Sequence, residues 1–115
     1  MGMRWKFSSD RIKSKYSAKS CTYNGIKFPS KLERDYYMHL DKLKSNGEIS
    51  FFLRQINFHL PGNTKYVCDF QVFWTNGEIT FEETKGMMTD IAILKIKQVE
   101  DLYPVKIKIV KRGDF

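Results

Sequence analysis

The sequence predicts an α/β fold in which a helix, three strands, a second helix and a fourth strand build a mixed four-stranded sheet. Three observations predict it. An apolar stripe at helical spacing ends near residue 47, and beyond it the apolar residues follow the period of strands. Asn76-Gly77 marks a hairpin between two of these strands. Pro104 separates a second helical segment from a final alternating stretch, because the residue before a proline disfavours helical backbone.

The first helix is expected to start after Ser30 and to end at Asn46-Gly47. Residues 23–28, which precede it, predict a turn and a short extended piece. Ser30 is a good N-cap, and Glu33 completes a capping box with it. One face of the helix carries an apolar stripe made of Leu32, Tyr36, Leu40 and Leu43.

The three strands that follow are expected at residues 51–60, 66–74 and 78–85. Pro61-Gly62-Asn63 separates the first two, so the three strands can form an antiparallel meander.

The second helix is expected to be capped by Thr89 or Asp90 and to stop before Pro104. Its apolar positions include Ile93, Ile96 and Leu102. The helix carries the chain across to a last strand, in which apolar residues alternate with lysines over residues 105–109.

Length and charge limit the classes of protein to which the chain can belong. A chain of 115 residues, 42% of them hydrophobic, forms one domain. Residues 1–34 hold nine Lys or Arg against two acids, whereas the remainder holds eleven of each sign, so the net charge of +7 is concentrated at the start. We therefore expect a basic, flexible arm at residues 1–22 and a single folded domain at residues 23–115. Such an arm is typical of proteins that bind phosphate backbones, although a purely solubilising tail has the same charge pattern.

Several classes of protein are not supported by the sequence. Cys21 and Cys68 lack metal-type spacing, so neither a disulfide scaffold nor a zinc knuckle is expected. No apolar run approaches the ~18 residues of a membrane span, and no signal sequence is recognisable, so we expect a soluble, cytoplasmic protein. The sequence has no glycine-rich phosphate loop, so no nucleotide cofactor is expected. His39 and His59 are single histidines, for which structural roles are favoured.

Four residues carry the most specific chemical signal: Glu33, Asp69, Glu83 and Lys85. Side chains alternate along a strand, so Glu83 and Lys85 project from the same side. Asp69 interrupts an apolar strand, where a buried charge is costly unless it is paired or binds a metal. Asp69 and Glu83 are expected to bind Mg²⁺ or Mn²⁺, and Lys85 to orient the attacking water, an arrangement that recurs in phosphodiester cleavage. Glu33 is expected to bind a second metal or a metal-bound water.

Structural alternatives for these residues remain open. Glu33 can be only the capping partner of Ser30, and Glu83 and Lys85 can belong to a solvated strand face. Asp69 is harder to explain without a site, because strand interiors are depleted in aspartate.

The register of the hairpin decides whether Asp69 and Glu83 share a face. A two-residue loop at Asn76-Gly77 puts them on opposite faces. A three-residue loop, with Gly77 in the left-handed position of a bulge, sets them directly opposite each other. The metal site requires the three-residue loop or an equivalent offset, although the apolar pattern favours the tighter loop.

The chain also resembles a known family over roughly residues 14–110. The matching segments are Ser14-Lys15-Tyr16, Tyr23 to Glu33, Leu53-Arg54-Gln55, Cys68-Asp69-Phe70, Glu82 to Gly86, Lys95-Ile96-Lys97 and Tyr103-Pro104. They are similar to a small phage and prophage family of PD-(D/E)XK nucleases that is catalogued without a function. The resemblance implies a restriction-endonuclease-like core with the order α-β-β-β-α-β, which the periodicity predicts independently. One departure is Val67-Cys68, which stands where many PD-(D/E)XK nucleases have a proline before the aspartate.

The resemblance implies further roles for individual residues. The backbone carbonyl of Thr84 would be another metal ligand. Gln55 matches a glutamine often found near the sites of relatives and is expected to bind DNA. Lys95 or Lys97 would contact the scissile phosphate. The other basic residues expected to bind DNA are Lys6, Arg11, Lys13, Lys15, Lys19 and Lys31.

The expected function is a metal-dependent endonuclease selective for branched DNA, such as Holliday junctions in phage recombination or replication. The chain has no room for a separate sequence-reading domain, and a basic arm contacts phosphates without reading bases. Cutting both strands of a junction needs two active sites, so we expect a homodimer, in the cytoplasm of a bacterial host. The alternatives are a nicking or end-processing subunit of a recombination or transposition complex, and a basic DNA-binding module without catalysis.

Overall fold

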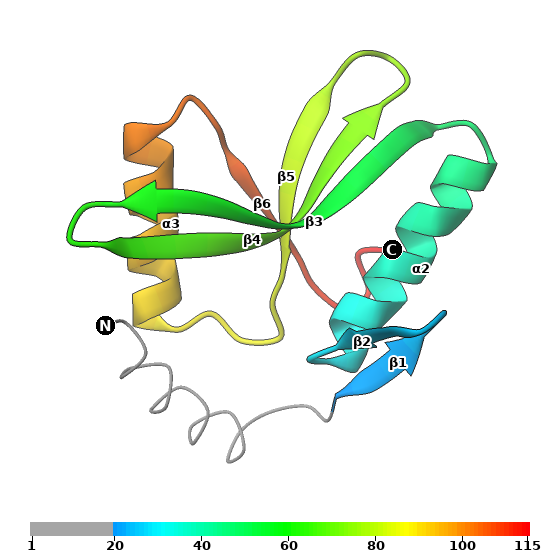
Figure 1. Cartoon of the computed structure of the whole chain (residues 1–115), viewed down its shortest axis with the longest axis horizontal. Coiled ribbons are helices and arrows are strands. Elements are labelled where there is room, and N and C mark those ends of the chain that lie inside the picture. The colour runs from blue at the N-terminus through cyan, green and yellow to red at the C-terminus, as the bar shows by residue number, and fades with distance from the viewer. Residues whose placement is uncertain (1–19) are drawn as a thin grey trace.

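The computed structural model describes residues 20–115, so most of the predicted arm lies outside the described residues. Its elements in chain order are β1 (Cys21–Tyr23), β2 (Ile26–Phe28), α2 (Lys31–Ser45), β3 (Ile49–Leu60), β4 (Thr64–Trp74), β5 (Ile79–Thr84), α3 (Asp90–Leu102) and β6 (Ile107–Val110). From α2 onward this is the predicted order, and the α/β fold is confirmed. The four-stranded sheet has the order β3-β4-β5-β6, with only β5 and β6 parallel to each other. Figure 1 shows α2 and α3 on opposite sides of the crossing strands.

The segment before α2 forms a two-stranded hairpin, where the sequence predicts only a turn and an extended piece. Asn24 and Gly25 both have positive φ, 52° and 76°, as the tight turn between such short strands requires. The hairpin includes Cys21 and Thr22, which the predicted arm also included. It buries Phe28 completely and sets its ring 5.2 Å from that of Tyr37 on α2.

The predicted N-cap of α2 is confirmed. The hydroxyl of Ser30 accepts a hydrogen bond from the backbone N–H of Glu33 at 3.1 Å. The helix ends at Asn46, and Gly47 follows with a φ of 84°. Neither α2 nor α3, the helices in the described part of the chain, is long and apolar enough to cross a membrane.

Two apolar clusters hold the described part of the chain together. One packs α2 on the sheet and consists of Tyr36, Leu40, Ile49, Phe70, Val72 and Val110. The other packs α3 beneath the far end of the β3–β4 hairpin and consists of Phe58, Leu60, Tyr66, Cys68, Ile96, Val99 and Ile107. Cys68 and Phe70 are two residues apart on β4 yet belong to different clusters, because a two-stranded ribbon twists strongly once it leaves the wider sheet. Asp69 therefore lies where β4 passes from one cluster to the other.

The β4–β5 hairpin has the register that the metal site requires. Phe70 pairs with Glu82 and Phe73 with Ile79, which sets Asp69 opposite Glu83. The N–H of Trp74 donates to the carbonyl of Glu78 at 2.9 Å, and the left-handed Gly77, with φ 93°, closes the three-residue loop.

The apolar pattern, which favoured the tighter loop, was therefore misleading. The observed register turns Thr80 and Glu82 toward α2, onto a face that the pattern expected to be apolar. These polar groups are tolerated there because they bond to one another and to aromatic donors. Thr80 Oγ1 donates to Glu82 Oε2 at 2.7 Å and accepts from Trp74 Nε1 at 2.9 Å, and the Tyr36 hydroxyl donates to Glu82 Oε1.

Candidate active site

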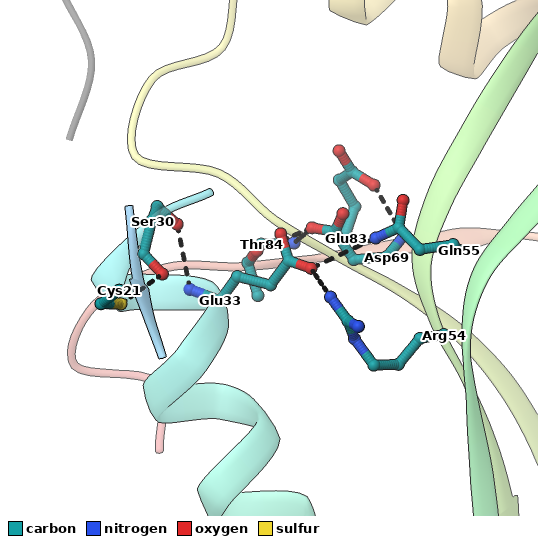
Figure 2. Close-up of polar contacts among 8 residues, drawn as sticks. All are labelled: Cys21, Ser30, Glu33, Arg54, Gln55, Asp69, Glu83 and Thr84. Carbon is teal, nitrogen blue, oxygen red and sulfur yellow. Dashed lines mark hydrogen bonds and ion pairs between the residues drawn. The ribbon is translucent and has the colours of Figure 1, made fainter. Parts of the chain in front are cut away.

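Asp69 and Glu83 face each other on adjacent strands (Figure 2). The backbone N–H of Asp69 donates to Glu83 Oε1 at 3.2 Å, and Glu83 is only 5% exposed. Because cross-strand partners project from the same face of a sheet, the two carboxylates share one side of it. The structure thus brings together two of the residues that the sequence named as metal ligands.

Thr84 holds Asp69 in place. Its backbone N–H and its hydroxyl both donate to Asp69 Oδ2, at 2.9 and 2.7 Å. Two bonds to one oxygen fix the orientation of the carboxylate. The sequence assigned only the backbone carbonyl of Thr84 to the site, and the role of its side chain was missed because a threonine in a strand is ordinary.

Burial and like charge act together on the acidic pair. Burial raises the pKa of the Asp69 carboxyl, although the hydrogen bonds from Thr84 oppose the shift. Burial, together with the charge of Asp69, raises the pKa of Glu83 to about 7. Ionising both carboxylates at once is therefore unfavourable. A bound cation would reduce the repulsion between them.

Lys85 follows on the same side of the chain as Glu83, as the strand alternation predicts. Its Nζ lies 3.5 Å from Glu83 Oε2, and its side chain is 32% exposed, so the amine borders both the acid and the solvent. The backbone N–H of Lys85 donates to the carbonyl of Val110 at 3.0 Å, which ties this end of β5 to β6.

Glu33 extends from α2 toward β3, where its carboxylate bonds to two side chains. The residue is 3% exposed, and its Oε2 accepts hydrogen bonds from Arg54 Nη2 at 2.9 Å and Gln55 Nε2 at 3.2 Å (Figure 2). Gln55 thus contacts one of the predicted site residues, and its role in DNA binding stays a prediction. Arg54 was not among the predicted site residues, because a lone arginine in a strand is typical of a solvated position and its partner is 21 residues away in the chain.

The acidic pair suits a hard divalent cation. Within residues 20–115 no group of three or more His, Cys, Asp and Glu side chains is arranged to hold a metal. Structural zinc sites usually need four such ligands, whereas Mg²⁺ commonly binds through one or two carboxylates and keeps several waters. Asp69 and Glu83 thus fit Mg²⁺ or Mn²⁺ better than zinc.

The predicted DNA-binding lysines and arginine are only partly described. Lys6, Arg11, Lys13, Lys15 and Lys19 lie outside the described residues.

Three others are on the described surface. Lys31 is exposed at the first position of α2. Lys95 Nζ donates to the carbonyl of Lys65 near the tip of the β3–β4 hairpin at 3.4 Å, and partial burial lowers its pKa. Lys97 lies in the second half of α3 beside a shallow depression that it shares with Glu100 and Lys106. Contact of Lys95 or Lys97 with a scissile phosphate stays a prediction.

Comparison with known proteins places the chain in a family. No curated protein matches it. A family model described as "Protein of unknown function (DUF1064)" matches residues 13–113, which include Glu33, Asp69, Glu83 and Lys85. Because the match covers most of its length, the chain belongs to this DUF1064 family.

Proposed function

We propose that this protein is a metal-dependent DNA endonuclease of the PD-(D/E)XK type, which hydrolyses phosphodiester bonds. One observation carries the proposal: Asp69 and Glu83 face each other across β4 and β5, with the amine of Lys85 3.5 Å from Glu83. A buried acid whose pKa is raised by burial and by a neighbouring carboxylate is unfavourable in a purely structural role, and such a pair suits the binding of a divalent cation. The order of the elements, helix, three strands, helix, strand, also supports it.

The charges around the site support a metal-dependent reaction on a phosphate. Glu33, Asp69 and Glu83 contribute three carboxylates, whereas Arg54 and Lys85 contribute two cations. When all are ionised the sum is −1, which repels a phosphodiester. A divalent cation changes the sum to +1, so the anionic substrate would be attracted only when the metal is bound.

The residues divide the chemistry of hydrolysis among them. Asp69 and Glu83 would hold Mg²⁺ or Mn²⁺, with the carbonyl of Thr84 as a further ligand. When bound, the ion would supply Lewis acidity to the phosphate oxygens and make water more acidic. Lys85 would donate a hydrogen bond to the attacking water, while Thr84 keeps Asp69 from rotating. Water adds across one P–O bond, and the leaving oxygen takes up a proton.

For the substrate, we propose branched DNA cut by a homodimer. Beyond the site, apolar side chains project from the sheet face that does not pack on α2: Phe51, Leu53 and Ile79 are 43–51% exposed, and Phe51 stacks on Phe73 with ring centroids 4.2 Å apart. Such a neutral patch on a chain of net charge +7 is suited to contact with a second copy. Phe52, by contrast, faces inward and packs against the α2 cluster.

Cleavage assays test this function. The wild-type protein and Asp69→Asn would be incubated with a four-way junction, a flap, a linear duplex and single-stranded DNA, in Mg²⁺, Mn²⁺ or EDTA, with molecular mass measured by analytical ultracentrifugation. We expect a dimer that cuts the junction, with no cleavage in EDTA or by Asp69→Asn. Equal cleavage by Asp69→Asn and the wild type would reject the assignment. Nicking by a monomer would favour an end-processing subunit instead.

A further inference from the structure

Gln55 has an unusual backbone conformation. Its φ of 58° is in the left-handed region, although it lies inside the 12-residue strand β3. The other non-glycine residues with positive φ in the described part of the chain are Asn24 and Asn63, which lie in hairpin turns. Such a conformation is unfavourable for a residue other than glycine and persists only where the surroundings impose it.

The consequence of this conformation is visible in the side chains. Arg54 and Gln55 are neighbours on a strand and would normally point to opposite faces. Instead both donate to the same oxygen, Glu33 Oε2 (Figure 2). The strand pairing resumes on either side, since Arg54 pairs with Phe70 and Ile56 with Cys68. The irregularity is therefore local, and it redirects two donors onto one carboxylate.

Arg54 also packs on an aromatic ring. Its guanidinium carbon lies 4.4 Å above the centre of the Phe28 ring, and its Nε is buried and has no hydrogen-bond partner among the described residues. A guanidinium held in this way is suited to fixing Glu33 and compensating its charge, rather than to reaching out to DNA.

We propose that Arg54 and Gln55 are positioning residues, which together clamp Glu33 toward the acidic pair, and that the left-handed backbone of Gln55 serves to bring both donors to it. This inference rests on the proposed nuclease function. The clamp keeps Glu33 oriented while Arg54 offsets its negative charge, so that a phosphodiester can approach a site that already contains Asp69 and Glu83.

The experiment separates the amide of Gln55 from its backbone conformation. Gln55→Gly keeps access to positive φ but removes the amide, and Gln55→Asn keeps a shorter amide and tolerates positive φ. Asn63→Gly, at a φ of 56° in the β3–β4 turn, is the matched control. We expect Gln55→Gly to lower kcat by about 10- to 100-fold with little change in KM or thermal stability. Gln55→Asn should recover part of the loss, and Asn63→Gly should cleave like the wild type.

A second measurement follows the clamp without any substrate. In an NMR spectrum of the DNA-free protein, the buried Arg54 Nε–H should give a slowly exchanging resonance that shifts in Glu33→Gln and in Gln55→Gly, but not in Asn63→Gly. Wild-type cleavage with equal kcat for Gln55→Gly and Asn63→Gly would overturn the clamp and leave the nuclease standing. Absence of wild-type cleavage on every substrate would overturn both.

Discussion

Glu82 and Glu83 are adjacent buried glutamates on β5 that have opposite surroundings. Glu82 is fully buried on the α2 side, where its carboxylate accepts hydrogen bonds from the hydroxyls of Tyr36 and Thr80. Glu83, on the other face, is 5% exposed and meets a second acid, Asp69, and the amine of Lys85. The two glutamates are thus both buried, but they have different kinds of neighbour.

The difference shows what burial alone can indicate. Neutral donors satisfy Glu82, so its role can be to join α2 to the sheet. Glu83 faces a like charge, which adds to burial in raising its pKa. A buried acid is therefore a candidate for function when a second acid lies beside it, and not merely because it is buried.

The largest effect expected from this comparison is on cleavage. Substituting a residue that hydrogen-bonds to a metal ligand typically lowers activity by about 10- to 100-fold. Glu83→Gln should lower kcat by more than this, because a neutral amide is a poor Mg²⁺ ligand. Glu82→Gln, one residue away and equally buried, should keep most of the activity. The measurement is single-turnover cleavage at saturating Mg²⁺. Similar losses in both variants would mean that β5 as a whole is disturbed and that the two acids do not differ in role.

Stability should respond in the opposite order. Glu82→Ala leaves the hydroxyls of Tyr36 and Thr80 without their acceptor and opens a cavity, so the free energy of unfolding should fall by about 2–4 kcal/mol. Glu83→Ala should cost less, since it also removes the repulsion of Asp69. Urea unfolding in EDTA measures both. A larger loss for Glu83→Ala would show that the repulsion is already relieved in the metal-free protein.

A smaller effect should appear in the pH dependence of stability without metal. The folded pKa of Glu83, about 7, lies above the ordinary value of a glutamate, near 4.3. Between these pKa values the folded state binds more protons than the unfolded state, so stability falls as pH rises and then levels off above about 7. Glu83→Gln lacks this contribution, so in EDTA the wild type should lose stability relative to the variant between pH 5 and 7. Parallel pH profiles would contradict the raised pKa.

The sequence predicted the elements of this fold well because their signals are local. The Ser30 cap, the Asn76-Gly77 turn and the stop before Pro104 each act within a few residues. The strand alternation also predicted that Glu83 and Lys85 share a side.

Other features depend on contacts between distant segments. The hairpin register followed Gly77 and the buried Thr80–Glu82 network, which apolar periodicity does not detect. The role of Arg54 depends on Glu33, 21 residues away, and on the left-handed φ of Gln55, for which no residue type in the strand gave a signal. The sequence thus named the acids of the site and Gln55, but not Arg54 or the side chain of Thr84, which also hold these acids.

The smallest effects are expected from substitutions of two threonines. Thr84 bonds to Asp69, beside Glu83, and Thr80 bonds to Glu82. Thr84→Val removes the hydroxyl that donates to Asp69 Oδ2 but keeps the backbone N–H bond to the same oxygen. Asp69 should therefore be less firmly oriented, and kcat should fall by no more than about 10-fold, the lower end for a residue behind a ligand.

Thr80→Val removes the hydroxyl between Trp74 and Glu82, both on the α2 side. It should cost about 1–2 kcal/mol of stability, because a buried carboxylate and an indole N–H each lose a partner, while kcat stays close to that of the wild type. Single-turnover rates and urea midpoints of the two variants, measured side by side, test the pair. If both variants lost activity, the contacts of β5 on its α2 face would also control the geometry of Asp69 and Glu83.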